Sequence, residues 1–385
     1  MKIVSIGEIL IDLTQKGFDE NGVPVYAANP GGAPANVAVA ASLMGADSAF
    51  IGKAGNDALG KMLKDTLTSK NVDVSGLKIE DKLNTTLALV SVDEKGDRSF
   101  SFYRDKTADV SLTKEDVPQE LIRNADILHF GSVSLTDEPS ASATAFAVES
   151  ASKLGKVISY DPNFRPLLWK DKDVAISKMK SLLKFVDIIK VSEEELELLS
   201  GKSDLNDGAD ELIKRGISFV IVTLGENGAF YKTQNYSGSQ KAFAGKVADT
   251  NGAGDTFFGT FLSQTEDFGE LLKNKDKAGE YIKFACAAAG LSVTRSGAIP
   301  AMPTYWRTPS RLRSWRDGSF PSSSSTTPRS ARKGRPWRFP GCWRRIVVIL
   351  TDAATMGNAG LKQLYNFSRT AELSLTKRRK MSRIS

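Results

Sequence analysis

Short apolar runs alternate with amphipathic segments along most of the chain. The runs have the length of buried strands, and the segments between them repeat apolar positions with the period of a helix. Strands are predicted at residues 2–7, 49–52, 127–131, 157–160, 186–190 and 219–222, and helices at 34–44, 57–70, 140–154, 173–183, 193–200, 208–215 and 277–294. This alternation predicts an α/β fold with a mostly parallel sheet, in which ligands bind at the carboxyl ends of the strands.

Two segments depart from that alternation. Residues 83–92 and 99–103 each alternate apolar with polar positions around the turn Glu94-Lys95-Gly96-Asp97, which is typical of a β-hairpin and here predicts a lid. Arg104 follows the hairpin, where it either holds a hydroxylated or anionic ligand or is a solvated charge. Asp12 follows the first strand and is expected on a loop or lid, as a ligand contact or as a turn residue.

The stretch from Asp249 to Gly259 carries the most specific chemistry. Gly252-Ala253-Gly254 precedes Asp255 and an apolar run with helical spacing, so these small residues are predicted to open a helix. A helix N-terminus attracts anions, and the glycines let a phosphate approach the backbone closely. A carboxylate beside a phosphate suits a base that takes the proton of an attacking hydroxyl; the alternative is that Asp255 only caps the helix. No GxxxxGK[ST] loop or intact GxGxxG fingerprint occurs.

Further polar clusters are predicted near ligand-binding edges. Residues 31–36 form a glycine pair followed by Ala-Pro-Ala-Asn, in which Asn36 could hydrogen-bond a sugar hydroxyl. Residues 161–165, 192–195 and 223–228 each follow a predicted strand at the carboxyl rim. Glu195 would act through water on a Mg²⁺ ion, or else belongs to a solvated helix start.

Charge divides the chain into two parts. The net charge of +7 combines 18 Lys and Arg against 3 Asp and Glu in residues 305–385 with 34 against 42 in the first 304 residues. Four of the five tryptophans also lie after residue 304. A break of this kind indicates two segments of different origin, of which the acidic one carries the chemistry above.

Several function classes fit the sequence poorly. The chain begins with too short an apolar run for a signal peptide and contains no apolar stretch of about 18 residues, so a cytoplasmic protein without a membrane partner is expected. Cys286 and Cys342 cannot form a disulfide framework, and the single histidine, His129, excludes a His-rich metal site. His129 lies in a predicted buried strand and is expected to be structural.

Two signatures resemble those of the ribokinase-like (PfkB) family of carbohydrate kinases, and within it most closely the fructokinases. They are residues 31–57 (GGAPANVAVAASLMGADSAFIGKAGND) and 249–261 (DTNGAGDTFFGTF), in the order and separation that the family shows. Residues 161–165 (DPNFR) and 223–225 (TLG) add to the match, which covers residues 1–304. The resemblance implies a three-layer fold with a small β lid formed by residues 10–30 and 83–104.

The resemblance also implies roles for individual residues. Asp255 would be the general base, and the amides of Gly252, Ala253 and Gly254 an anion hole for the migrating phosphoryl group. The implied sugar contacts are Asp12, Gly32, Asn36, Arg104 and Arg165; the nucleotide contacts are Thr223, Gly225, Gly228 and Gly254; the residues near Mg²⁺ or a monovalent cation such as K⁺ are Glu195, Asp249, Asn251 and Ser292. Ser192 departs from the asparagine of the family motif.

The implied activity is ATP- and Mg²⁺-dependent phosphorylation of a sugar, with D-fructose as acceptor and fructose 6-phosphate as product. The alternative acceptor is 2-keto-3-deoxygluconate, whose kinases share much of the first signature, or another sugar of the family. A function of another class is a binding or regulatory protein on a kinase fold that has lost its chemistry. A homodimer is compatible with the family, and no specific nucleic-acid partner is expected.

The segment of residues 305–385 does not match the family. Basic runs with interleaved aromatics are compatible with a tail that binds nucleic acid or an anionic surface. A shift of reading frame that replaced the native C-terminus explains the simultaneous rise in Arg, Ser and Trp better, and predicts disorder. An amphipathic membrane anchor fits poorly, because prolines interrupt the segment.

The frame-shift interpretation predicts that deleting residues 305–385 leaves the specific activity unchanged, because an unselected segment has no evolved contacts. Kinase activity and thermal midpoint should be measured for the full chain and for a truncation after Thr304. Nucleic-acid binding by the full chain should be weak, independent of sequence and steeply salt-dependent. A large loss of activity or stability on truncation would instead indicate a working module.

Overall fold

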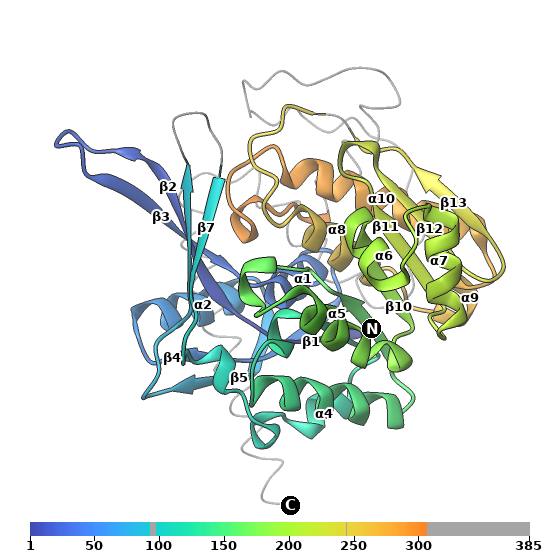
Figure 1. The fold of residues 1–385 in the computed structure, drawn as a ribbon, viewed down its shortest axis with the longest axis horizontal. Coiled ribbons are helices and arrows are strands. Elements are labelled where there is room, and N and C mark those ends of the chain that lie inside the picture. Colours follow the sequence, from blue (N-terminus) through green and yellow to red (C-terminus); the bar gives the residue numbers. More distant parts are fainter. Residues whose placement is uncertain (93–97, 244, 306–385) are drawn as a thin grey trace, which may run out of the picture. The chain divides into compact units, whose positions relative to one another are not determined.

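Two β-sheets organise the part of the chain that this computed structural model describes, which comprises residues 1–92, 98–243 and 245–305 (Figure 1). The large sheet has nine strands, in the spatial order β13 (Ser237–Gln240), β12 (Ala229–Lys232), β11 (Phe219–Thr223), β10 (Ile188–Ser192), β9 (Val157–Asp161), β8 (Ile127–Gly131), β1 (Lys2–Ile6), β4 (Asp47–Gly55) and β5 (Val72–Glu80). The strands from β11 to β5 are parallel to one another. Strand β12 pairs antiparallel with β11, and β13 pairs antiparallel with β12. The central strands are mostly apolar because helices cover both of their faces; His129 in β8 and Lys190 in β10 are exceptions.

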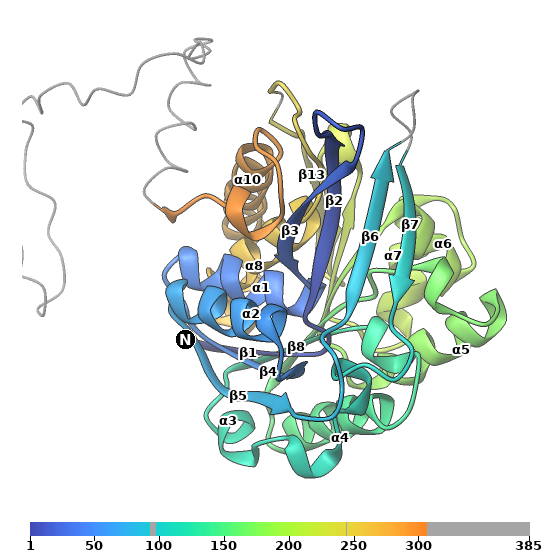
Figure 2. The same cartoon turned by 90° about the vertical axis from the view of Figure 1, so that its left-hand side faces the viewer.

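The helices form a layer on each face of the large sheet (Figure 2). Their bounds are α1 (Ala33–Leu43), α2 (Ala58–Ser69), α3 (Gln119–Arg123), α4 (Ser140–Lys153), α5 (Lys172–Ser181), α6 (Glu193–Ser200), α7 (Leu205–Lys214), α8 (Ala253–Leu262), α9 (Phe268–Leu271) and α10 (Lys275–Ser292). One core cluster joins the sheet to α4, α5, α6 and α7, and another joins it to α1, α8 and α10. The chain therefore has the three-layer α/β fold that the sequence predicts. Within the described residues, no helix combines the length and apolar character needed to cross a membrane.

Helices α1 and α8 lie unusually close together. A Cβ atom at Gly259 would lie 2.6 Å from the Cβ of Ala40 and from the carbonyl oxygen of Val37, so only glycine permits this approach. Phe258 and Phe261 of α8 are fully buried against the sheet. This packing fixes the N-terminus of α8 beside the start of α1.

The small sheet has four strands, in the order β3 (Pro24–Gly31), β2 (Leu10–Phe18), β6 (Leu87–Val92) and β7 (Arg98–Tyr103). Strands β6 and β7 pair antiparallel, as their alternating pattern predicts, and β2 runs parallel to β6 (Figure 2). Asp12 was expected on a loop or lid; the loop is wrong, because this residue pairs in β2 of the small sheet with Asn29 of β3 and Ala88 of β6.

Most predicted elements of the large sheet agree with the structure to within a few residues. Strands β5, β12 and β13 were not predicted: β5 lacks a clear apolar period, and the other two are short. His129 is fully buried in β8, where its Nδ1 lies 3.1 Å from the Ser159 hydroxyl and its ring meets Phe258 edge-on, in agreement with a structural role. The hairpin turn at 94–97 and the basic segment after Tyr305 lie outside the described residues.

Candidate active site

Helix α8 begins at a glycine that no other residue could replace without strain. Gly252 has φ 71°, and a Cβ atom there would lie 2.7 Å from the Cβ of Ala298. Gly252 supplies no side-chain cap, so no side chain of the cap residue covers the amides of the first helical turn. The helix that the sequence predicts is confirmed, and its N-terminus can receive an anion.

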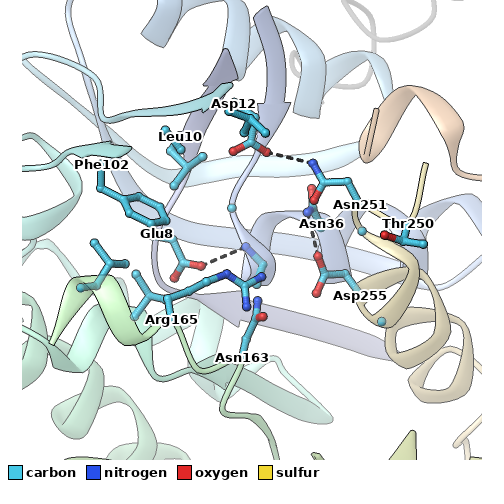
Figure 3. A pocket seen from close by; sticks show the side chains of 18 of the residues that line it. Glu8, Leu10, Asp12, Asn36, Phe102, Asn163, Arg165, Thr250, Asn251 and Asp255 are labelled. Carbon is cyan, nitrogen blue, oxygen red and sulfur yellow. Dashed lines mark hydrogen bonds between the residues drawn. The ribbon is translucent and has the colours of Figure 1, made fainter. Parts of the chain in front are cut away.

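Asp255 occupies the first turn of α8 and is 8% exposed. The side-chain Nδ2 of Asn36, in α1, donates a 2.8 Å hydrogen bond to Asp255 Oδ2 (Figure 3). Burial raises the pKa of Asp255 to about 6, with repulsion from Asp161 adding to it, while Lys190, Asn36 and Arg165 act to lower it. The carboxylate is therefore ionised at neutral pH, yet basic enough to accept a proton.

Two cavities meet at the start of α8. The first has a volume of about 500 Å³ and contains Asp255, Asn36 and Asp12, whose side chains converge in Figure 3. The second, of about 690 Å³, lies against β11, the following turn and α10. Both are lined by Thr250, Ala253 and Gly254. A group bound at the N-terminus of α8 can therefore be reached from either cavity.

Carboxylates dominate the first cavity. Asp12 projects from β2 of the small sheet, and Asn251 Nδ2 donates to its Oδ2 at 3.4 Å. Burial raises the pKa of Asp12 to about 6 and that of Glu8 to about 7. Glu8 is 3% exposed; its Oε1 accepts from the Ala33 amide at 2.9 Å, and its Oε2 has no partner among the described residues. Such oxygens suit a neutral ligand that donates hydrogen bonds from several hydroxyls.

Gly32 joins the small sheet to α1 under tight packing. Its φ is 106°, and a Cβ atom would lie 2.5 Å from the carbonyl oxygen of Glu8. A side chain at position 32 would therefore push apart the two segments that carry Glu8 and Asn36.

The structure brings most of the predicted site residues to the two cavities. Those that line the first are Asp12, Gly32, Asn36, Arg165, Asp249, Asn251, Gly252, Ala253, Gly254 and Asp255. Those that line the second are Thr223, Gly225, Gly228, Ala253 and Gly254. Arg104, Glu195 and Ser292 line neither cavity.

Arg104 is engaged by hydrogen-bond partners of its own. Its Nε donates to Asp109 Oδ2 at 2.7 Å, one terminal nitrogen to the Thr136 hydroxyl at 2.6 Å, and the other to the Val133 carbonyl at 3.1 Å. Only 8% of Arg104 is exposed, and its guanidinium belongs to this buried network and is not part of the cavity lining.

Glu195 and Ser292 also have structural partners. Glu195 forms a capping box with Ser192 at the start of α6: its Oε2 accepts from the Ser192 amide at 2.8 Å and its Oε1 from the Phe164 amide at 2.7 Å. The hydroxyl of Ser292 donates to the Ala289 carbonyl of its own helix. The described residues contain no group of three or more His, Cys, Asp or Glu side chains arranged for a metal ion.

Two buried ionisable residues of the first cavity, Glu8 and Lys190, were not predicted. Each carried a signal in the sequence. Glu8 is an acid directly after the first buried strand, and Lys190 is a lone cation inside the apolar run of β10. A charge in such a position is rare unless it is paired or used.

Comparisons with known proteins find relatives in both sequence and fold. The model of the pfkB family of carbohydrate kinases matches residues 1–305. Fructokinase-2 of Solanum lycopersicum is 40% identical over 305 residues, which are 78% of this chain and 93% of that protein. The structure of a fructokinase with bound ATP from Xylella fastidiosa superimposes with a TM-score of 0.77 at 31% identity, covering 82% of this chain and 99% of the other. The structure of a fructokinase from Vibrio cholerae O395, with fructose, ADP and calcium ion bound, superimposes with a TM-score of 0.72 at 32% identity. The match covers 80% of this chain and 98% of the other.

The raised pKa of Asp255 predicts a stability cost. Folding moves this pKa from its ordinary 3.8 to about 6, so the unfavourable contribution of the carboxylate grows as the pH rises through that interval and is constant above it. Asp255→Asn should therefore unfold with a free energy higher than wild type by on the order of 3 kcal/mol at about pH 8, and by about half as much near pH 5. Urea titrations at both pH values test this. An asparagine variant that is less stable at both would contradict the burial argument.

Proposed function

Because the chain belongs to the pfkB family of carbohydrate kinases, we propose that it transfers the terminal phosphoryl group of ATP to D-fructose and forms fructose 6-phosphate. The observation that carries the proposal is the meeting of two cavities at the start of α8, with a buried carboxylate of pKa about 6 on the side of the first cavity. A reaction between two bound substrates needs this arrangement.

The sugar occupies the first cavity in this proposal. Asp12 and Glu8 accept hydrogen bonds from its hydroxyls, and Asn36, which already holds Asp255, has an unpaired Oδ1 that can accept another. The small sheet acts as the lid, since Asp12 of β2 and Phe102 of β7 both line the cavity (Figure 3). Binding the sugar beneath the lid would exclude water, which would otherwise accept the phosphoryl group.

The nucleotide occupies the second cavity, between Thr223 to Gly228 and the small residues of α10. Its terminal phosphate reaches Gly254, where the α8 amides stabilise the transferred group. The sugar hydroxyl attacks phosphorus, its proton passes to Asp255, and ADP leaves with the bonding electrons.

The proposal also assigns positions to two metal ions, Mg²⁺ and K⁺. Mg²⁺ on nucleotide phosphates keeps several water ligands and needs few carboxylates, which fits described residues in which no three His, Cys, Asp or Glu side chains are arranged to hold a metal ion. Asp161 Oδ1 is a buried carboxylate oxygen without a partner there, whereas both oxygens of Glu195 are used, so Glu195 would act only through water. When bound, the ion would neutralise phosphate charge. The loop of Asp249 and Asn251 is the proposed location of K⁺.

The charge of the first cavity favours fructose over 2-keto-3-deoxygluconate. A sugar acid would bring its carboxylate beside Asp12 and Asp255, which are mostly ionised at neutral pH, and beside the partly ionised Glu8, with Arg165 and Lys190 as the cations of the lining. Like charges in a low-dielectric cavity repel strongly. A neutral ketohexose avoids this repulsion and supplies hydroxyl donors to the same oxygens.

The proposal predicts that D-fructose gives the highest kcat/KM in a panel with D-ribose, D-glucose and 2-keto-3-deoxygluconate, measured as ADP formation. Asp255→Asn is the matched control, because it keeps the shape of the site; its turnover should fall by roughly 10²–10⁴-fold while ATP affinity hardly changes.

Three outcomes would contradict parts of this proposal. Preference for the sugar acid would overturn the substrate, and near-normal turnover of Asp255→Asn would overturn the base. If no sugar of the panel supported ATP consumption, the result would favour the alternative of a binding or regulatory protein.

A further inference from the structure

Lys190 is a buried cation in the middle of an apolar strand. It lies in β10 between Ile189 and Val191, and 7% of the residue is exposed. Burying an ammonium group is costly unless a partner compensates it. A tyrosine, leucine or methionine would be the ordinary choice for packing alone, so the charge calls for an explanation.

The partner of Lys190 is Asp161, at the end of the neighbouring strand β9. Lys190 Nζ donates to Asp161 Oδ2 at 2.6 Å, and the aspartate side chain is 1% exposed. An ammonium group carries three N–H donors, and Asp161 is its one hydrogen-bond partner among the described residues. Two donors are therefore available to a ligand.

The ammonium lies against the first turn of α8. A Cβ atom at Gly254 would be 3.0 Å from Lys190 Nζ and 4.0 Å from its Cε. Gly254 does not have a positive φ, so its backbone does not require glycine. The absence of a side chain instead leaves room for the ammonium, which lines the first cavity together with Gly254 and Asp255.

The positive charge of Lys190 interacts electrostatically with three carboxylates. Burial acts to lower the pKa of Lys190, but Asp161, Glu195 and Asp255 outweigh it, so the pKa lies above its ordinary value. Lys190 in turn acts to lower the pKa of Asp255. The ammonium is thus charged at neutral pH, beside the base.

We propose that Lys190 is a catalytic residue of phosphoryl transfer, whose two unpaired N–H groups hydrogen-bond oxygens of the migrating phosphoryl group while Asp161 holds the ammonium in place. This role rests on the proposed kinase function. As the sugar oxygen bonds to phosphorus and the bond to ADP breaks, the α8 amides and Lys190 hold the phosphoryl oxygens from two sides. The proton still passes to Asp255, and Lys190 exchanges none.

The competing explanation is a buried ion pair that only stabilises the sheet. Removing Lys190 alone would then act through the uncompensated charge of Asp161. The double variant Lys190→Met/Asp161→Asn removes both charges at similar volume, so it separates catalysis from stability.

Lys53 offers a matched control in the same fold. It is also a strand lysine, 6% exposed, whose Nζ lies 2.7 Å from Asp116, but it lines neither cavity. Lys53→Met should lower the thermal midpoint and leave kcat close to wild type.

The test uses the full chain, ATP and the best sugar of the panel. Lys190→Met and the double variant should both lose roughly 10²–10³-fold in kcat, as for other lost transition-state donors, with the sugar KM changing by less than about threefold. Lys190→Met should also shift the acid limb of the pH profile to higher pH, because Asp255 loses a neighbouring positive charge.

A folded double variant with kcat within about threefold of wild type would overturn the catalytic role while leaving the kinase function intact. So would a Lys53→Met variant that loses as much kcat as Lys190→Met. If no sugar of the panel supports ATP consumption by the wild-type chain, the proposed function fails, and the role of Lys190 fails with it.

Discussion

The site depends on one electrostatic constraint: a carboxylate must remain ionised in the turn of α8 that is built to receive an anion. Asp255 is buried there, and burial raises its pKa to about 6. Bulk water would lower the cost of keeping this carboxylate ionised, but it would also accept the phosphoryl group. The protein keeps the carboxylate dry and stabilises it with one hydrogen bond from Asn36 and with the positive charge of Lys190.

The rest of the fold positions these three groups. Asn36 belongs to α1, Lys190 to β10 and Asp255 to α8, and all three elements pack on or within the large sheet. The close approach of α1 and α8 at Gly259 sets the relation of Asn36 to Asp255. The small sheet adds Asp12, which is linked to the α8 side by Asn251. This hydrogen bond connects the small sheet to the segment that leads into α8.

The sequence predicted what local patterns encode. The alternation of apolar runs gave the parallel sheet, and the glycines before Asp255 gave the start of α8, because both depend on neighbours in the chain. Contacts between residues that are distant in the chain could not be predicted from these local patterns. Arg104 is held by Asp109, Thr136 and Val133, and Glu195 by the Phe164 amide, and neither residue lines the two cavities. Lys190 was overlooked because an apolar strand was expected to be structural throughout.

The most direct test of this account is the pH dependence of kcat/KM for fructose, since it reports the ionisation of essential groups in the free enzyme. An Asp255 base with its pKa raised by burial predicts a rate constant that falls with acid, half-lost near pH 6. A rate constant that stays flat between about pH 5 and 8 would contradict the buried base on which the proposed mechanism rests.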